Sequence, residues 1–486
     1  MMNSQTLMPE LAKLKNFVNC EISSIHIDSR EVKQGGVFFA IKGSNLNGAD
    51  FIEQAKSRGA SLIISEELVQ DTKVVYCNNL KELLGKFTSR FYSEPSKKLI
   101  TFCATGTNGK TTSVEAYAKI CKNLGKQCGY LSTIGKSIDG MGINEFLPLT
   151  TPDPITLNRS LSEMLLSGTT RVAFEASSHG LDQNRLTGIN IDYAILTSFS
   201  QDHLDYHKSI EEYGNAKSIL FKKLKPKYSI IQIDSEFGKN LYTDLLKDET
   251  DTFSVSLEQE SDFFASFKKK NESLEVSLRS PYGVAEFQLG TISRFIASNV
   301  ICSIAALSIE GIDIELLAKH ASKITFPSGR LESVRVGKDI CYIDYAHTPE
   351  ALKYALKEIR EFHDGEIWCV FGCGGNRDKD KRPMMGKIAE KYSDHVIITD
   401  DNPRNEASKE IINDILEGTT SSANVKAISN RSEAIKFTLE EMAKKKSMNI
   451  MLLAGKGHEN FQIIGSERFK FDDKETLISL SKKLKH

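Results

Sequence analysis

Short apolar runs alternate with amphipathic helical patterns along much of this 486-residue chain. The alternation is clearest in the last third, where each apolar run ends in a polar cluster and a helical pattern precedes the next run. The predicted strands there are 340–345, 367–371, 395–399 and 450–453, and the predicted helices are 349–361, 408–416 and 433–443. This succession predicts a parallel sheet, and such sheets bind ligands at the carboxyl ends of their strands.

The same two periodicities occur earlier in the chain. Strand patterns at 25–27, 37–41 and 61–64, with a helical pattern at 50–58, predict a small α/β domain. Later strand patterns lie at 99–103, 172–174, 193–196 and 228–233. In the helix that follows residue 109, the apolar side chains are expected to share one face, as in a helix packed on a sheet; they are Val114, Tyr117, Ala118 and Cys121.

Two further segments divide the chain. Residues 252–289 turn at Asn271 and at 281–283, which predicts an antiparallel patch, and a helix at 293–307 follows it. The stretch Phe326-Pro327-Ser328-Gly329 interrupts both periodicities and reads as a linker. We therefore expect three domains, at 1–96, 97–327 and 328–486, as the length also favours.

One segment joins a strand directly to a helix through a glycine-rich turn. It reads Ala104-Thr105-Gly106-Thr107-Asn108-Gly109-Lys110-Thr111-Thr112. Backbone N–H groups of such a turn cradle phosphates, Lys110 can reach the outer phosphates, and Thr111 can ligate magnesium. The alternative is an ordinary glycine turn, and Ala104 stands where the general motif has its first glycine. The motif favours a central P-loop ATPase-like parallel-sheet domain, and the alternation of strands and helices in the last third favours a C-terminal Rossmann-like domain, so we expect an α/β protein.

Composition excludes several other classes of protein. The formal charge of -1 and the pI near 6.8 give no basic field for nucleic acid or anionic lipid. No apolar run reaches the roughly 18 residues that span a bilayer. Nine scattered cysteines indicate neither a disulfide framework nor a zinc site. We expect a cytoplasmic protein with reduced thiols, no membrane insertion and no nucleic-acid partner.

Two polar clusters in the second domain are candidates for metal or phosphate contact. Glu175 follows a strand, where a carboxylate can complete the magnesium site begun by Thr111; alternatively, it caps the next helix. The cluster Asp202-His203-Leu204-Asp205-Tyr206-His207 follows another strand, and Lys217 lies in the helical pattern after it. A lone histidine would more often be structural, but six clustered residues beside a phosphate loop favour a functional role.

The polar clusters of the third domain have the chemistry of an amino-acid site. Arg377 and Arg404 can each grip a carboxylate bidentately, although a single arginine is more often part of a surface ion pair. Together with Asp401, Asn402 and Glu459, the two arginines could bind a zwitterion.

These motifs together resemble those of the Mur ligase family, over nearly the whole chain. The similarity rests on Asp28-Ser29-Arg30, the loop at 105–112, Thr150-Thr151-Pro152, 175–180 with Gln183 and Arg185, 202–207 with Lys217, Asn299, 329–332, 344–349, 374–378, 401–404 and 455–459. The pattern is most similar to members that add the third peptide residue of the peptidoglycan precursor. The resemblance implies that ATP converts a glutamate γ-carboxylate into an acyl phosphate, which the incoming amine then attacks.

The resemblance also implies residue roles. Catalysis would involve Lys110, Glu175, His203 and Lys217, and Mg²⁺ would be held by Thr111, Glu175, His203 and Lys217, the last carbamylated by CO₂. ATP would be bound by Gly106, Thr107, Asn108, Gly109, Lys110, Thr111, Thr112, Asn299, Arg330, Asp344 and His347. The UDP-muramoyl dipeptide would contact Ser29, Thr150, Thr151, Ser177, Gln183 and Arg185, with a weaker match at Ser44-Asn45-Leu46.

The added amino acid is implied to be meso-diaminopimelate, held by Arg377, Asp401, Asn402, Pro403, Arg404, Gly455 and Glu459. Family members that add L-lysine usually lack the arginine of the Asp401-Asn402-Pro403-Arg404 string, and Asn376 departs from the more usual aspartate. The alternatives are an L-lysine-adding homologue, a ligase like folylpolyglutamate synthetase, and, from another class, a P-loop regulator whose turnover responds to a macromolecule. We expect a monomer whose partners are small-molecule substrates.

Overall fold

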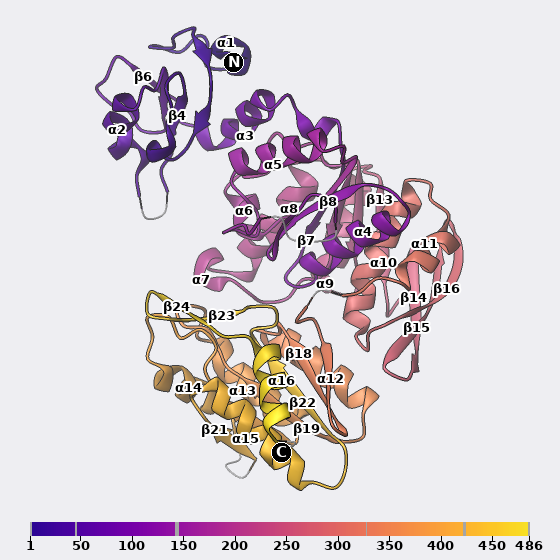
Figure 1. Cartoon of the computed structure of the whole chain (residues 1–486). Helices are drawn as coiled ribbons and strands as arrows, with labels where there is room; N and C mark the ends of the chain where they lie inside the picture. Colours follow the sequence, from indigo (N-terminus) through magenta and orange to yellow (C-terminus); the bar gives the residue numbers. More distant parts are fainter. Residues whose placement is uncertain (1, 44–45, 141–144, 327, 421–423, 485–486) are drawn as a thin grey trace.

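The computed structural model describes residues 2–43, 46–140, 145–326, 328–420 and 424–484. Within these residues, three sheets of four, ten and six strands form three domains, and two further pairs of strands accompany them. Figure 1 shows the first domain at one end of the molecule, the C-terminal domain at the other, and the central domain between them. The expected three-domain α/β architecture is confirmed. The boundaries at residues 97 and 328 stay predictions, and Pro327 of the expected linker lies outside the described residues.

The first domain is built on the parallel sheet β3-β4-β5-β6. Its strand β4 is buried along its whole length between two apolar clusters, as continuous apolar runs in parallel sheets require. The elements of this part of the chain are β1 (Met2–Asn3), α1 (Ser4–Leu7), β2 (Glu21–Ile22), β3 (Ile25–His26), η1 (Ser29–Glu31), β4 (Val37–Ala40), η2 (Gly48–Phe51), α2 (Ile52–Ser57), β5 (Leu62–Ser65), β6 (Val74–Tyr76), α3 (Leu80–Phe91) and η3 (Pro95–Lys97).

The central sheet has the order β16-β15-β14-β13-β12-β11-β7-β10-β8-β9. Its strands are β7 (Ile100–Thr105), β8 (Cys128–Ser132), β9 (Gly135–Ser137), β10 (Arg171–Glu175), β11 (Tyr193–Leu196), β12 (Tyr228–Gln232), β13 (Thr252–Ser256), β14 (Phe263–Lys270), β15 (Ser273–Ser280) and β16 (Gly283–Leu289). The predicted antiparallel patch is correct for β14 to β16 but wrong for β13, which pairs parallel with both neighbours. The patch thus extends the parallel sheet instead of forming a separate one.

Helices cover both faces of the central sheet (Figure 1). They are α4 (Lys110–Asn123), α5 (Pro154–Leu166), α6 (Ser178–Asp182), α7 (Leu204–His207), α8 (Ile210–Lys222), α9 (Glu236–Lys247), α10 (Arg294–Ile309) and α11 (Ile314–Ala321). The four apolar side chains expected on one face of α4 are buried in the core against the sheet, and every other residue from Thr111 to Ala118 is buried as well. Helix α10 packs on α4, and Ser303 donates to the Ser113 carbonyl at 3.0 Å.

The C-terminal sheet has the order β17-β18-β22-β19-β20-β21, with only β17 antiparallel to its neighbour. The elements are β17 (Glu332–Val336), β18 (Asp339–Asp344), α12 (Pro349–Phe362), β19 (Glu366–Phe371), α13 (Lys381–Tyr392), β20 (His395–Ile398), α14 (Ser408–Leu416), β21 (Val425–Ala427), α15 (Arg431–Lys444), β22 (Asn449–Ala454), β23 (Phe461–Ile464), β24 (Glu467–Lys470) and α16 (Asp473–Leu484). The four predicted polar clusters follow β18, β19, β20 and β22, so they share one edge of the sheet. The β23–β24 hairpin lies on the side that faces the central domain (Figure 1).

Candidate active site

The glycine-rich loop lies between β7 and α4, at the carboxyl end of the central sheet. Gly109 precedes α4 with φ 91°, and a Cβ added there would stand 2.4 Å from Asn299 Oδ1. Glycine is therefore required both by the left-handed backbone and by the close approach of α10. Ala104, the departure from the general motif, is fully buried inside β7. The predicted strand, loop and helix are thus present in the expected order.

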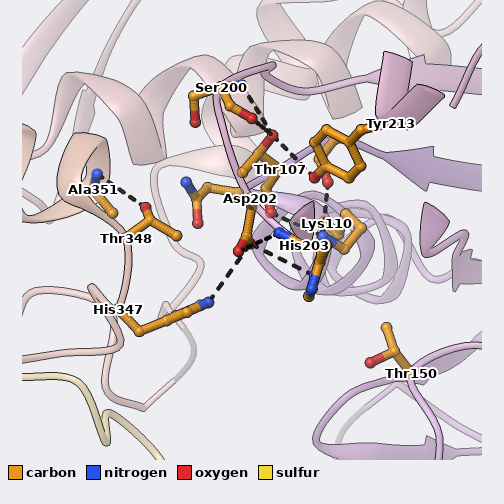
Figure 2. A network of polar contacts seen from close by, with 12 residues as sticks. Thr107, Lys110, Thr150, Ser200, Asp202, His203, Tyr213, His347, Thr348 and Ala351 are labelled. Carbon is orange, nitrogen blue, oxygen red and sulfur yellow. Dashed lines mark hydrogen bonds and ion pairs between the residues drawn. The ribbon is translucent and has the colours of Figure 1, made fainter. Parts of the chain in front are cut away.

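The loop is braced by the segment that follows β11. Thr197 Oγ1 and Ser198 Oγ donate to the Asn108 carbonyl at 2.6 and 3.0 Å. Ser200 N donates to Thr107 Oγ1 at 3.0 Å, as Figure 2 shows. This support holds the loop amides in place before any ligand arrives. Because the bracing residues are short polar side chains after a strand, their signal in the sequence is weak.

Two lysines, the half-buried Lys110 and the buried Lys217, meet at one carbonyl of the loop. Lys110 Nζ and Lys217 Nζ donate to Gly106 O at 2.8 and 2.9 Å. Burial lowers the pKa of Lys110. Burial, together with the charge of Lys110, holds the pKa of Lys217 well below its usual range. Lys217 Nζ also lies 4.3 Å above the Tyr213 ring. The arrangement favours an uncharged amine at Lys217.

Glu175 lies at the end of β10, directly beside the phosphate loop. Its Oε1 accepts from Thr111 Oγ1 and from Thr133 N, both at 2.8 Å. The alternative that Glu175 caps the next helix is wrong, because Ser177 is the residue whose side chain caps α6. A hydroxyl and a carboxylate in contact beside a phosphate loop are the oxygen donors that magnesium prefers.

Asp202 connects the two halves of the site. Its Oδ2 lies 3.6 Å from His203 Nε2 and 4.0 Å from His347 Nε2, which belongs to the C-terminal domain (Figure 2). His347 Nδ1 donates to the Tyr345 carbonyl at 2.8 Å. Burial lowers the pKa of His203 to about 3, so its imidazole is neutral and can offer a lone pair.

Two arginines of the C-terminal domain face this region from the loops after β19 and β20. Arg404 Nη1 donates to Gly375 O at 2.9 Å, and Arg377 Nη1 donates to Asn376 O at 3.1 Å. Burial lowers the pKa of Arg404, and the positive charge of Arg377 lowers it further. Among the described residues, no carboxylate forms an ion pair with either guanidinium. Both guanidinium groups are therefore able to bind anionic groups.

An acidic group completes the same edge of the sheet. Glu459 Oε2 accepts from Asn402 Nδ2 at 2.8 Å and lies 3.3 Å from the fully buried Lys456 Nζ. Burial raises the pKa of Glu459, and the charge of Asp401 raises it further. Positive and negative groups thus stand a short distance apart, as binding of an amino acid requires.

One cavity of about 340 Å³ brings residues of both domains together. The predicted site residues that line it are Thr107, Asn108, Gly109, Lys110, Thr111, Thr150, Glu175, Ser177, His203, Lys217, Arg330, His347, Arg377, Asp401, Asn402, Arg404, Gly455 and Glu459. His347, expected near the nucleotide, shares this cavity both with the phosphate loop and with the groups expected to bind the amino acid.

A second cavity, of about 410 Å³, lies on the other side of the phosphate loop. It is lined by Asn108, Gly109, Thr112, Arg330 and Asp344, among others. The Arg330 guanidinium stacks 4.7 Å above the Tyr345 ring, and burial raises the pKa of Asp344 to about 6. Asn299 lies behind Gly109, and both of its polar side-chain atoms are buried without a hydrogen-bond partner in the described structure.

The remaining predicted residues line neither cavity: Gly106, Asn299, Ser29, Thr151, Gln183, Arg185 and Pro403. Arg185 nevertheless lies next to the site, because its Nη1 donates to Thr151 O at 2.7 Å and its Nη2 to Gln183 Oε1 at 2.6 Å. Ser29 lies in the first domain, where it donates to Gln54 Oε1 at 2.6 Å. Residues 44 and 45 of the expected 44–46 contact lie outside the described residues.

Sequence reasoning missed several residues that line the first cavity or contact its lining. Tyr345 and Lys381 line it, Thr133 contacts Glu175, and Lys456 holds Glu459. Lys456 lies within the 455–459 cluster already identified in the sequence, so its position next to the predicted acidic contact Glu459 could have indicated its role. Thr133 and Lys381 carry no such signal, because their places depend on how separate elements pack.

Comparison with known proteins identifies the family. Its models match residues 21–92 as the catalytic domain, 104–307 as the middle domain and 329–457 as the glutamate ligase domain. The chain belongs to the Mur ligase family. The UDP-N-acetylmuramoyl-L-alanyl-D-glutamate--2,6-diaminopimelate ligase of Bacillus cereus is 36% identical, covering 94% of this chain and 93% of its own. Members of the family are ATP-dependent ligases of peptidoglycan synthesis, so this chain is a ligase of cell-wall biogenesis.

Solved structures agree with this assignment. A structure of a UDP-N-acetylmuramoyl-L-alanyl-D-glutamate--2,6-diaminopimelate ligase is 31% identical, covers 96% of both chains and has a TM-score of 0.70. Folylpolyglutamate synthase from Mycobacterium tuberculosis shares the fold, with a TM-score of 0.64 at 16% identity, but covers 77% of this Mur ligase. Within the described residues, no helix combines the length and apolar character needed to cross a bilayer.

Proposed function

We propose that this Mur ligase joins meso-2,6-diaminopimelate to the γ-carboxylate of D-glutamate in UDP-N-acetylmuramoyl-L-alanyl-D-glutamate, with ATP as the energy source. The observation that carries the proposal is the 340 Å³ cavity, where Lys110 of the phosphate loop shares one space with Arg377 and Arg404. Such a reaction needs a group that binds the transferred phosphate close to a site that binds the amino acid, here through two arginines. The names of the similar ligases from several bacteria support the same substrates.

The reaction activates a carboxylate, which is a poor electrophile until its oxygen becomes a good leaving group. In the proposed sequence the γ-carboxylate attacks the terminal phosphorus of ATP, forming an acyl phosphate and ADP. The diaminopimelate amine then attacks the acyl carbon, and the tetrahedral intermediate expels phosphate to leave an amide. Lys110 and the loop amides offset the repulsion between the anions. The second cavity would take the nucleoside, contacted by Arg330 and Asp344.

The residues present fit a magnesium site, since the Thr111 hydroxyl and the Glu175 carboxylate are already in contact. Thr111, Glu175, His203 and a carbamylated Lys217 would hold Mg²⁺, which would neutralise phosphate charge when bound. Within the described residues, no three His, Cys, Asp or Glu side chains gather as a metal site, so the proposed set draws on hydroxyl and carbamate oxygens as well. An uncharged, buried amine is the form that adds to CO₂, which supports carbamylation at Lys217.

Selection of the amino acid is assigned to the C-terminal loops. Diaminopimelate carries a second carboxylate that L-lysine lacks, and Arg404 has no carboxylate partner among the described residues. Asp401 and Glu459 would receive the ammonium group, while Asn402, Pro403 and Gly455 shape the loops around it. A site built for a carboxylate leaves its cation unpaired when lysine binds, which penalises lysine strongly.

The other substrate would enter from the side of the first domain. Thr150, Thr151 and Ser177 would contact the muramoyl dipeptide; Arg185 would pair with its carboxylate, and Gln183 would steady Arg185. Ser29 would take the UDP end. We further propose that the enzyme acts as a monomer in the cytoplasm, with these small molecules as its partners.

Phosphate release in the presence of the UDP-muramoyl dipeptide tests the proposal. Turnover is measured with meso-diaminopimelate, L-lysine and L-ornithine, and the product is identified by mass. We expect turnover that requires both the dipeptide and diaminopimelate. Turnover with lysine at equal efficiency would instead identify a lysine-adding homologue, and ATP hydrolysis without any amino acid would refute the ligase assignment.

A further inference from the structure

The two loops that carry the arginines are joined closely to each other. We call residues 372–380, after β19, the β19 loop, and residues 399–407, after β20, the β20 loop. Gly375 N donates to Asn402 O at 2.9 Å, and Arg404 Nη1 donates back to Gly375 O at 2.9 Å. A Cβ added to Gly375 would stand 1.9 Å from Pro403 O. No side chain fits between the loops at this point.

This close approach brings two positive charges together. Arg377 and Arg404 line the same cavity, and the charge of Arg377 is one of the causes that lower the pKa of Arg404. Two guanidinium groups repel each other when no anion lies between them. Something other than the arginines must therefore hold the loops in this arrangement before a substrate binds.

Glu406 and Arg382 form the link that does so. Glu406, at the end of the β20 loop, accepts from Asn376 N of the β19 loop at 2.5 Å. It also accepts from Arg382 Nη1 and Nη2 at 2.9 and 3.1 Å. Arg382, at the start of α13, is fully buried and donates to Gly374 O at 3.3 Å. The Arg382 hydrogen bonds hold the pKa of Glu406 at about 2.

The backbone of both loops also requires outside support. Asn376 and Arg404 have φ values of 53° and 51°, in the left-handed region that is unfavourable for a residue with a side chain. Asn376 Oδ1 accepts from Asn405 N of the β20 loop at 3.1 Å, and Arg404 donates to Gly375 O of the β19 loop. Each of the two residues thus contacts the other loop. Such conformations persist where surrounding contacts over-determine them.

We propose that Glu406, together with Arg382, is a positioning residue for amino-acid selection: it ties the β19 loop to the β20 loop so that Arg377 and Arg404 converge on one anionic group. The inference deepens the proposed function and rests on it. Neither Glu406 nor Arg382 lines the cavity, so both act through the arginines. The gain is preorganisation, since the repulsion between the guanidiniums is overcome by folding and not by substrate binding.

The chain offers a matched control. Arg382 Nη1 also donates to Asp414 Oδ2 at 2.7 Å, and Asp414 lies on α14, where no hydrogen bond or ion pair of the described residues joins it to the β19 loop. Glu406→Ala and Asp414→Ala each remove one carboxylate from the same buried arginine and leave the other as its counter-ion. Only the first removes a hydrogen bond between the two loops, the one from Asn376 N to Glu406.

The test measures kcat and KM of the full-length enzyme for diaminopimelate, L-lysine and ATP. For Glu406→Ala we expect the KM for diaminopimelate to rise at least tenfold, and its preference over lysine to fall at least tenfold. The KM for ATP should stay within twofold. Asp414→Ala should keep all of these within twofold. Glu406→Gln should lie between, because its carbonyl oxygen can still accept from Asn376 N.

Equal changes in Glu406→Ala and Asp414→Ala, or an unchanged preference in Glu406→Ala, would overturn the inference. Thermal melting checks that each variant folds. Should the alanine variant not fold, Glu406→Gln decides, with at least a threefold loss of preference expected and an unchanged preference refuting the link. If the parent enzyme does not use diaminopimelate, the proposed function is wrong, and this inference is wrong with it. If the parent enzyme uses diaminopimelate but the variants keep its KM and its preference over lysine, only this inference is wrong.

Discussion

Replacing Arg404 by methionine tests the assignment of amino-acid selection most directly. Methionine keeps an apolar stem of similar length and removes the charged fork. In the structure, Arg404 Nη1 is committed to the Gly375 carbonyl at 2.9 Å. No described residue accepts from Nε or Nη2 at hydrogen-bonding distance. One edge of the guanidinium is thus available for the bidentate geometry that a carboxylate matches.

The size of the effect follows from that free edge. Two hydrogen bonds to a charged group contribute about 1.5–3 kcal/mol each, or about 3–6 kcal/mol for the pair. Since about 1.4 kcal/mol corresponds to a factor of ten, kcat/KM for diaminopimelate should fall by roughly 10² to 10⁴. For L-lysine, which has no second carboxylate, kcat/KM should stay within about tenfold or rise, because an unpaired cation has been removed.

The assay is phosphate release at saturating ATP and UDP-muramoyl dipeptide, with each amino acid varied in turn. Arg335→Met serves as the control, because Arg335 is an exposed arginine that pairs with Glu272 and does not line either cavity. An equal loss of kcat/KM for diaminopimelate and lysine would refute the reasoning. So would a loss for diaminopimelate smaller than tenfold.

Three further predictions concern other parts of the molecule. Lys217→Ala should lose at least 100-fold in activity, and mass measurement of the active parent should find one added carboxyl group; a free amine in active enzyme, with full activity in the variant, would contradict this. Burial raises the pKa of Glu358 to about 7, so its contribution to stability is present below pH 4.5 and is lost as the pH rises through 7. Glu358→Gln should therefore raise the free energy of unfolding at pH 8 by up to about 3 kcal/mol but not at pH 5, and equal effects at both would oppose it. Asp473→Ala leaves the fully buried Arg431 without its ion-pair partner and should cost about 3–5 kcal/mol in urea unfolding. Arg431→Met with Asp473→Leu should recover most of that; a cost below 1 kcal/mol for the single variant would be the contrary result.

Local patterns predicted the elements that lie nearest to the chemistry. The strand at 193–196 and the helix at 408–416 match β11 and α14 in both bounds. The four polar clusters of the third domain lie at the carboxyl ends of their strands, because strand order does not change which end of a parallel strand faces the ligand edge. The phosphate loop was predictable for the same reason, since it depends on residues adjacent in the chain.

Contacts between distant elements were not predictable. Residues 111–118 of α4 are all buried, because α10 packs on this helix in addition to the sheet, and no periodicity within α4 indicates that neighbour. His347 Nε2 of the C-terminal domain lies 4.0 Å from Asp202 Oδ2 of the central domain, a contact that no local pattern predicts, and the assignment of His347 to the nucleotide stays a prediction. Strand β13 pairs parallel with β12, and the direction of that pairing depends on the position of β12 in the sheet and not on the residues of β13. Each of these outcomes depends on packing between segments far apart in the sequence.

Both cavities are lined partly by the central domain and partly by the C-terminal domain. A ligand that must contact both domains at once binds with an apparent affinity that depends on the fraction of molecules in which the domains stand this close. Arg294 of the central domain and Glu361 of α12 form one of the contacts between the domains, at 3.1 Å. Breaking that ion pair would change the fraction of molecules in which the two domains stand this close. It would thereby change the apparent dissociation constant of a ligand that neither residue touches.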